Sequence, residues 1–191
     1  MSQSLFTSEI FFEPAISSAD ALRIFRQRKG LLSSKRTVVK SECIFLPIYI
    51  FDIETEDKQK NSACHEVCVD AIEGQFALIQ TKDLKTTKND VNTYGGFLIP
   101  EEIARERAYW EFSIHLQRFK PGVALKEICL KSKSRYPYWI GFFESTKGYS
   151  FEAIDGFSGK FQGVKMQSLF SKLILQRSNY LKDSAYTELE I

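Results

Sequence analysis

The sequence has few of the residues and motifs that usually mark a catalytic site. Only two histidines, His65 and His115, occur among its 191 residues. It has no Gly-x-Ser-x-Gly elbow, phosphate-binding loop, dinucleotide fingerprint or calcium loop. Because catalysis usually needs such groups in defined patterns, we expect a protein that is not an enzyme and that needs no cofactor.

Cysteine is also scarce, with four residues scattered through strand-like segments. This pattern favours reduced core thiols over a disulfide framework. The densest group of metal-ligand types is Cys64-His65-x-x-Cys68, to which Cys43 or Cys129 could add a further zinc ligand. Cys64 and Cys68 share one face of a predicted strand, next to core positions, so we interpret them as core thiols and expect no metal site.

Excess charge and long apolar runs are missing as well. The 26 basic and 24 acidic residues give a net charge of +2, which is less than a dedicated nucleic-acid-binding protein usually carries. No run of eighteen apolar residues occurs, and the first residues have neither the basic nor the apolar region of a signal peptide. We therefore expect a cytoplasmic protein without a membrane span.

What the sequence does have is a turn motif that occurs twice, at 70–76 and 155–161. Each copy has Asp, then Gly four residues later, then Phe two residues after that, between runs of strand-forming residues. This pattern predicts a hairpin turn in which Asp accepts hydrogen bonds from turn amides and Gly takes a positive φ. We expect the carboxylates to be structural rather than a catalytic pair. The predicted turn residues are Asp70, Gly74, Asp155 and Gly159.

The elements around the two turns follow a similar order. A helix is predicted after Ser17 or Ser18, and another after Pro100, with Ala104, Ala108, Phe112, Leu116 and Phe119 at helical spacing. A long strand with an internal proline follows each helix, at Pro47 and at Pro137. Residues 166–174 predict an amphipathic helix.

The predicted fold is α+β, with two pseudo-repeated units, each a helix followed by a three-stranded antiparallel meander, and a C-terminal amphipathic helix. We place the first unit at 1–80, a linker or long loop at 81–98, the second unit at 99–165, and the last helix and tail at 166–191.

This order of elements, with a strand that ends in Val-Asp-Ala-x-x-Gly-x-Phe, resembles the PepSY family, whose units carry a Val-Asp-Ala-x-Thr-Gly turn. The resemblance implies a non-catalytic module that binds or restrains a protein partner, since this family is often attached to peptidases or their regulators. The matching positions are Val69, Asp70, Ala71, Gly74 and Phe76 in the first copy, and Ile154, Asp155, Gly156, Gly159 and Phe161 in the second.

The leading hypothesis for function is a non-catalytic protein-interaction or regulatory module, such as an adaptor, that binds a protein partner. The candidate partner-binding residues are Tyr49, Tyr138 and Trp139, in the two proline-containing strands. These strands could accept a partner strand at an edge, or use proline to prevent such pairing. The apolar face of the last helix fits either its own sheet or a second subunit, which leaves a homo-oligomer open.

The alternative hypothesis is binding of nucleic acid or of an acidic partner through a basic patch. Residues 23–40 contain seven basic residues and no acidic one up to Glu42, and the second predicted unit has basic residues in the matching region. A solvated helix end also explains the first cluster. The patch residues are Arg23, Arg26, Arg28, Lys29, Lys35, Arg36, Lys131, Lys133 and Arg135.

Overall fold

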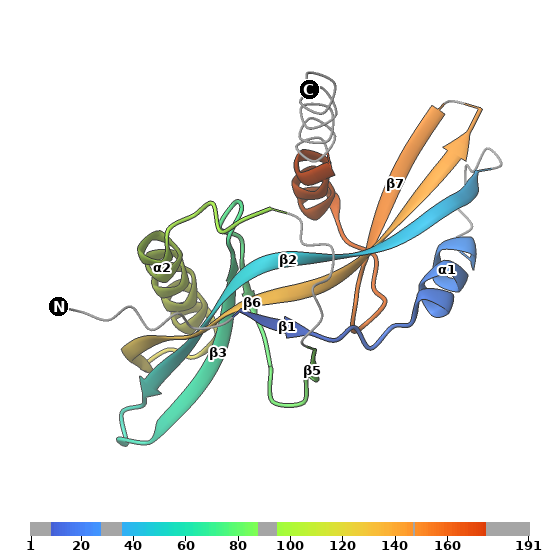
Figure 1. Cartoon of the computed structure of the whole chain (residues 1–191). Helices are drawn as coiled ribbons and strands as arrows, with labels where there is room; N and C mark the ends of the chain where they lie inside the picture. Colours follow the sequence, from blue (N-terminus) through green and yellow to red (C-terminus); the bar gives the residue numbers. More distant parts are fainter. Residues whose placement is uncertain (1–8, 28–35, 88–94, 147, 175–191) are drawn as a thin grey trace. The chain divides into compact units, whose positions relative to one another are not determined.

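The computed structural model describes residues 9–27, 36–87, 95–146 and 148–174. Two helices lie within these residues, α1 (Ser18–Gln27) and α2 (Glu101–Phe119), and residues 164–174 form a further helical segment. The strands are β1 (Ile10–Phe12), β2 (Thr37–Glu56), β3 (Ser62–Asp70), β4 (Phe76–Leu78), β5 (Thr86–Thr87), β6 (Ala124–Ser145) and β7 (Gly148–Asp155). The predicted α+β class is thus confirmed (Figure 1).

All the described strands belong to one sheet. Its order is β4-β3-β2-β6-β1-β5, and β7 pairs with β6 away from this path. β2 and β3 are antiparallel, with Ile48 opposite Asp70, and β6 and β7 are antiparallel, with Tyr138 opposite Asp155. β1 runs parallel to β6, so the sheet is mixed.

The chain divides into two compact units that are not contiguous in sequence. Unit 1 comprises Met1–Glu13, Leu46–Asn89 and Gly95–Tyr136, and unit 2 comprises Pro14–Phe45, Asp90–Tyr94 and Pro137–Ile191. The long strands β2 and β6 therefore each contribute residues to both units.

The predicted fold of two helix-then-meander units is wrong. In unit 1, α2 comes from the second half of the sequence and the β3–β4 hairpin from the first half. In unit 2, α1 comes from the first half and the β6–β7 hairpin from the second. Among the described residues, unit 2 has an isolated bridge between Ile154 and Phe161 in place of the third strand of a meander. Apolar periodicity tells which face of a helix is buried, but not which hairpin covers it.

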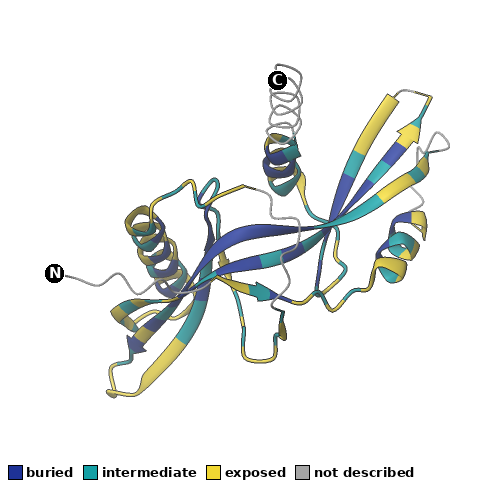
Figure 2. Cartoon of the chain, viewed as in Figure 1, coloured by how far each residue is buried: buried dark blue, intermediate teal, exposed yellow. Residues whose placement is uncertain are grey.

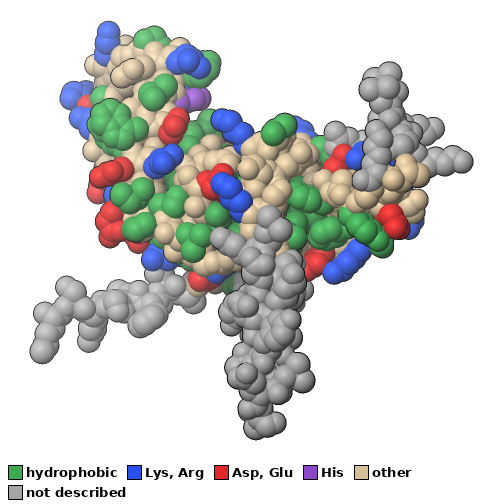
Figure 3. Space-filling view, turned by 90° about the horizontal axis from the view of Figure 1, so that it is seen from above, with side chains coloured by type: hydrophobic (Ala, Val, Ile, Leu, Met, Phe, Trp, Pro, Cys, Tyr) green, Lys and Arg blue, Asp and Glu red, His purple; other side chains and the backbone are tan. Residues whose placement is uncertain are grey.

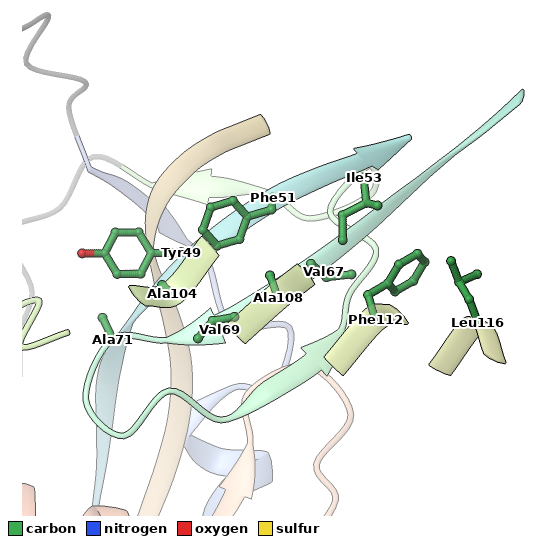
Figure 4. Close-up of a cluster of buried hydrophobic side chains, with 10 residues drawn as sticks. All are labelled: Tyr49, Phe51, Ile53, Val67, Val69, Ala71, Ala104, Ala108, Phe112 and Leu116. Carbon is green, nitrogen blue, oxygen red and sulfur yellow. The ribbon is translucent and has the colours of Figure 1, made fainter. Parts of the chain in front are cut away.

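The core of unit 1 lies between α2 and one face of the sheet (Figure 4). Alternation along the strands directs Tyr49, Phe51 and Ile53 of β2, and Val67 and Val69 of β3, toward the helix. The helix contributes residues four positions apart, of which the first two are alanines that allow close approach to the strands. These are Ala104, Ala108, Phe112 and Leu116, as the sequence predicts. Phe119, predicted on the same face, is 63% exposed because α2 ends there.

The core of unit 2 is built on α1 in the same way. Ala21 and Phe25 pack against Trp139, Phe143 and Ile154. The helix begins as predicted, since the Ser17 hydroxyl accepts a hydrogen bond from the Asp20 amide at 3.1 Å.

The C-terminal helical segment 164–174 also belongs to unit 2, and it appears where the apolar pattern predicts it. Leu169, Phe170 and Leu173 are buried (Figure 2). The ring of Phe170 lies 5.1 Å from that of Tyr138 in an edge contact. The segment therefore packs on a residue of β6.

Candidate functional site

Each predicted turn is held by its aspartate. In the first, Oδ1 of Asp70 accepts hydrogen bonds from the amides of Ile72 at 3.0 Å and Glu73 at 2.7 Å, and Oδ2 accepts one from Gln75. In the second, Oδ1 of Asp155 accepts hydrogen bonds from the amides of Phe157 and Ser158 at 3.0 and 2.7 Å. The φ angles of Gly74 and Gly159 are 76° and 66°. Both carboxylates therefore serve the turns, as the spacing predicts.

Each turn also binds the chain just before a helix. In unit 1 the Ile99 amide donates to the Ala71 carbonyl at 2.9 Å, and the Tyr49 hydroxyl donates to the Ile99 carbonyl at 2.8 Å. Burial raises the pKa of the Tyr49 phenol, which keeps it protonated as a donor. Only Gly fits the turn closely, because a Cβ on Gly74 would lie 3.0 Å from Cδ1 of Ile99.

Unit 2 repeats this contact with other residues. The Ile16 amide donates to the Gly156 carbonyl at 2.9 Å, and Nε1 of Trp139 donates to the Ile16 carbonyl at 2.9 Å. Sequence reasoning did not predict that each turn would bind the chain before a helix from the other half of the sequence. The signal that the two isoleucines occupy equivalent positions was their spacing, because each lies five residues before a buried alanine, Ala21 or Ala104.

The candidate partner-binding aromatics lie in or against these cores. Tyr49 and Trp139 are 2% and 8% exposed, and Tyr138 is half-buried against Phe170. In this structure Tyr49 and Trp139 orient the starts of α2 and α1. Their role in partner binding stays a prediction.

The cysteine–histidine cluster is divided between two faces of β3. The His65 ring packs against Phe112 of α2 in a tilted contact, with ring centroids 5.3 Å apart, whereas the adjacent Cys64 is exposed. Within the residues that the structure describes, no group of three or more His, Cys, Asp or Glu side chains could hold a metal ion.

The four thiols are free, and they differ in environment. Cys43 and Cys68 are half-buried, and desolvation raises the pKa of each to about 12, so both remain thiols at neutral pH. Cys64 and Cys129 are exposed, and the expectation of a core position is wrong for them. The residues of β3 that face α2 are the odd-numbered ones, so the even-numbered Cys64 lies on the opposite face from the one predicted.

The basic residues predicted in the second half of the chain form ion pairs within unit 1. Lys131 binds Glu66 and lies 3.6 Å from Asp52, and the hydrogen bond with Glu66 raises the pKa of Lys131. Nζ of Lys133 lies 3.6 Å from Glu101. Arg135 is 6% exposed and donates to Glu9 at 2.6 Å.

The basic residues of the first half belong to unit 2. Arg23 pairs with Asp20 at 2.6 Å, and Arg36 pairs with the buried Glu152 at 2.8 Å while lying over the Phe143 ring. Arg26 is exposed at the end of α1. Arg28, Lys29 and Lys35 lie outside the described residues. Most of the described candidate cations thus have acidic partners within their own unit.

An exposed apolar surface occurs on α2, on the side of the helix away from the sheet. We call it the α2 outer stripe and define it as Ile103, Trp110 and Ile114, which are 44%, 65% and 51% exposed. At 100° per residue these positions lie almost opposite the buried stripe. Tyr109, 42% exposed, packs edge-on against Trp110 at 5.6 Å. Figure 3 shows hydrophobic side chains at the surface in the region of α2, among acidic and basic ones.

Sequence reasoning missed this stripe because it sought a single apolar face on each helix. The signal was present, since Ile103, Trp110 and Ile114 also recur at helical spacing.

The fold and these contacts define an α+β protein whose prominent exposed feature is an apolar helix surface. No helix among the described residues is long and apolar enough to cross a membrane. Comparison with protein-family models, curated proteins and solved structures finds no match for this chain. The resemblance to PepSY units therefore stays a prediction that depends on the two turns.

Proposed function

We propose that this protein is a non-catalytic protein-interaction module, and that it binds another polypeptide through the α2 outer stripe. The observation that carries the proposal is the exposure of Ile103, Trp110 and Ile114 along one line of a helix. Apolar patches of this kind on a folded protein often mark interaction sites, and Trp and Tyr are enriched among residues that dominate binding energy.

The rigidity of α2 supports this function. The chain before the helix is fixed by the hydrogen bonds of Ile99 with Ala71 and Tyr49. Arg105 binds Glu101 at 2.8 Å and the Ile128 carbonyl at 3.1 Å, which attaches the helix to β6. A binding surface on an element held in this way loses little conformational entropy when a partner binds.

The structural roles of the acidic turn residues support the non-catalytic part of the proposal. The Asp70 and Asp155 carboxylates accept two or more hydrogen bonds each from the turns. A carboxylate whose oxygens already accept hydrogen bonds from turn amides has fewer lone pairs left to accept a proton from a substrate. Both carboxylates therefore act in stabilising the turns, which supports a structural role over a catalytic one.

Site-specific photo-crosslinking tests the proposal. A benzophenone side chain replaces Trp110 in the full chain, which is then irradiated in its native cells. The control carries the same group at Tyr149, an aromatic residue of unit 2 that is 80% exposed. We expect position 110, and not position 149, to form a discrete crosslink to a polypeptide that persists after nuclease treatment. Equal crosslinking at both positions, or none at 110, would contradict the proposal.

The same experiment addresses the nucleic-acid alternative. Binding that depends on the basic residues weakens steeply with salt and is lost with nuclease. Recovery of nucleic acid with the chain, abolished by high salt, would favour the alternative over the α2 outer stripe.

A further inference from the structure

We infer that two copies of this chain pair through the edge of the sheet formed by the first half of β2. Residues 37–45 of the two copies lie antiparallel, with a two-fold axis between the two Ser41 residues. This contact is separate from the α2 outer stripe, and it does not depend on the proposed function.

The first half of β2 forms an edge of the sheet. β3 pairs with β2 along Ile48–Glu56, and the Ala71 amide donates to the Pro47 carbonyl at 2.8 Å. Before Pro47, no described strand lies on this side of β2, and the strand order within unit 2 is β2, β6, β7 (Figure 1). Such an edge presents backbone N–H and C=O groups that another strand can pair with.

This edge is held in place and has little protection against strand pairing. Val38 and Cys43 pack against the core of unit 2, so little conformational entropy is lost when a strand is added. Residues 37–46 contain no proline, and Val39 is 58% exposed. Charge is the remaining protection, at Lys40 and Glu42. Because these two charges have opposite signs, they do not repel a second copy of the same edge.

Charge complementarity identifies the occupant as a second copy. Nζ of Lys40 lies 2.9 Å from Oε2 of Glu42, so the two side chains share one face of β2. With the axis at Ser41, Lys40 lies opposite the partner's Glu42, and Glu42 lies opposite the partner's Lys40. The two internal ion pairs thereby join into a ring of four alternating charges. Opposite charges directly across an antiparallel pair stabilise it, and the 64% exposed Lys40 side chain can reach across.

The residues that flank this ring are matched as well. The same axis places Val39 opposite the partner's Cys43, and Val38 opposite the partner's Ile44. Apolar residues therefore face apolar residues on both sides of the ring, and the exposed Val39 gains a neighbour.

Neighbouring registers are less favourable. Side chains alternate between the two faces of a strand, so directly opposite residues must lie on the same face, and each allowed change of register moves the axis by one residue. An axis at position 40 places Lys40 against the partner's Lys40, and an axis at position 42 places Glu42 against the partner's Glu42. Like charges directly opposite are destabilising, so the charges select the register centred on Ser41.

Charge reversal within the full-length chain tests the pairing. Sedimentation velocity over a range of protein concentrations measures the monomer–dimer equilibrium of the 22.0 kDa chain. We expect the wild type to dimerise reversibly. Lys40→Glu and Glu42→Lys should each weaken dimerisation by about tenfold or more, because each places like charges together at two symmetric contacts. The double variant K40E/E42K restores opposite charges and should regain much of the dimer.

The matched control is Arg23→Glu, which removes an exposed ion pair of unit 2, between Arg23 and Asp20, without changing β2. This variant should leave the equilibrium unchanged. Circular dichroism confirms that each variant is folded.

Crosslinking with a short bis-maleimide, whose two alkenes each add one thiol, tests the register. The exposed Cys64 and Cys129 are first replaced by serine. In this background Ser41→Cys places two thiols across the axis from each other, and we expect a covalent dimer. The control is Tyr149→Cys on β7, a position that is 80% exposed, which should give little of this product.

Three results would each overturn the inference. They are a wild-type chain that stays monomeric at all concentrations, a double variant that dimerises no better than the single ones, and equal crosslinking at positions 41 and 149. None of these results bears on the proposed function, which the crosslink at position 110 tests by itself.

Discussion

At the scale of single residues, the Asp70 carboxylate stabilises its turn by accepting several hydrogen bonds. It is 5% exposed and accepts hydrogen bonds from three backbone amides. Asp70→Asn replaces one acceptor oxygen with a donor and leaves a buried amide unsatisfied, so the free energy of unfolding should fall by about 1–3 kcal/mol. Urea denaturation measures the loss, with the exposed Asp83→Asn as control. An Asp70→Asn variant as stable as the control would contradict the structural role.

Gly141 makes a second residue-scale prediction. A Cβ at this position would lie 2.8 Å from the Phe25 ring. Gly141→Ala should therefore destabilise the protein by about 1–3 kcal/mol through overpacking. Gly163→Ala is the matched control, since nothing lies within 4 Å of its Cβ position. Thermal unfolding compares the two, and Phe25→Leu in the Gly141→Ala background should recover part of the loss.

His65 predicts a dependence of stability on pH. Its pKa is lowered from 6.5 by burial and by the charges of Lys120 and His115. The unfolded chain therefore binds a proton at a higher pH than the folded chain, and the free energy of unfolding should decrease as the pH falls below about 6.5. His65→Gln should reduce this slope. If urea titrations between neutral and mildly acidic pH give the same slope for both proteins, the assignment to His65 is wrong.

At the scale of elements, α2 has two apolar surfaces with opposite roles. Phe112 is 2% exposed in the core, and Trp110, two residues earlier, is 65% exposed. Phe112→Ala should destabilise the protein by about 3–5 kcal/mol. Trp110→Ser should change the free energy of unfolding by less than about 0.5 kcal/mol, yet abolish partner binding. A large loss of stability for Trp110→Ser would mean that this side chain belongs to the fold and not to an interface.

How far the sequence predicts this element shows where local reasoning ends. The four-residue spacing of Ala104, Ala108, Phe112 and Leu116 predicts the buried face, because burial follows directly from periodicity. Likewise, Asp and Gly at fixed offsets predict both turns, because turn chemistry is local. The residues of the outer stripe also recur at helical spacing, seven and four positions apart, and the position of the sheet decides which of the two apolar faces is covered.

At the scale of the whole molecule, the sequence predicts the α+β class but not how helices and hairpins associate. Similar helices precede similar strands in both halves of the chain, so each helix could cover either hairpin without violating any local preference. Tertiary contacts decide between them, such as the hydrogen bonds of Ile99 with Ala71 and of Ile16 with Gly156. These contacts join residues far apart in sequence, which a pattern within one segment cannot reveal.

Because each helix packs on the hairpin from the other half of the chain, neither half should fold alone. Residues 1–80 contain β2, β3 and β4 but lack α2, whose removal exposes the apolar row of Tyr49, Phe51 and Ile53. Residues 95–191 contain α2 without the hairpin that it covers. Each fragment alone should therefore lack a cooperative unfolding transition. The pair 1–94 and 95–191, produced together, should form a complex with the near-ultraviolet circular dichroism of the intact chain. Cooperative unfolding of 1–80 alone would instead show that this segment forms its core without α2.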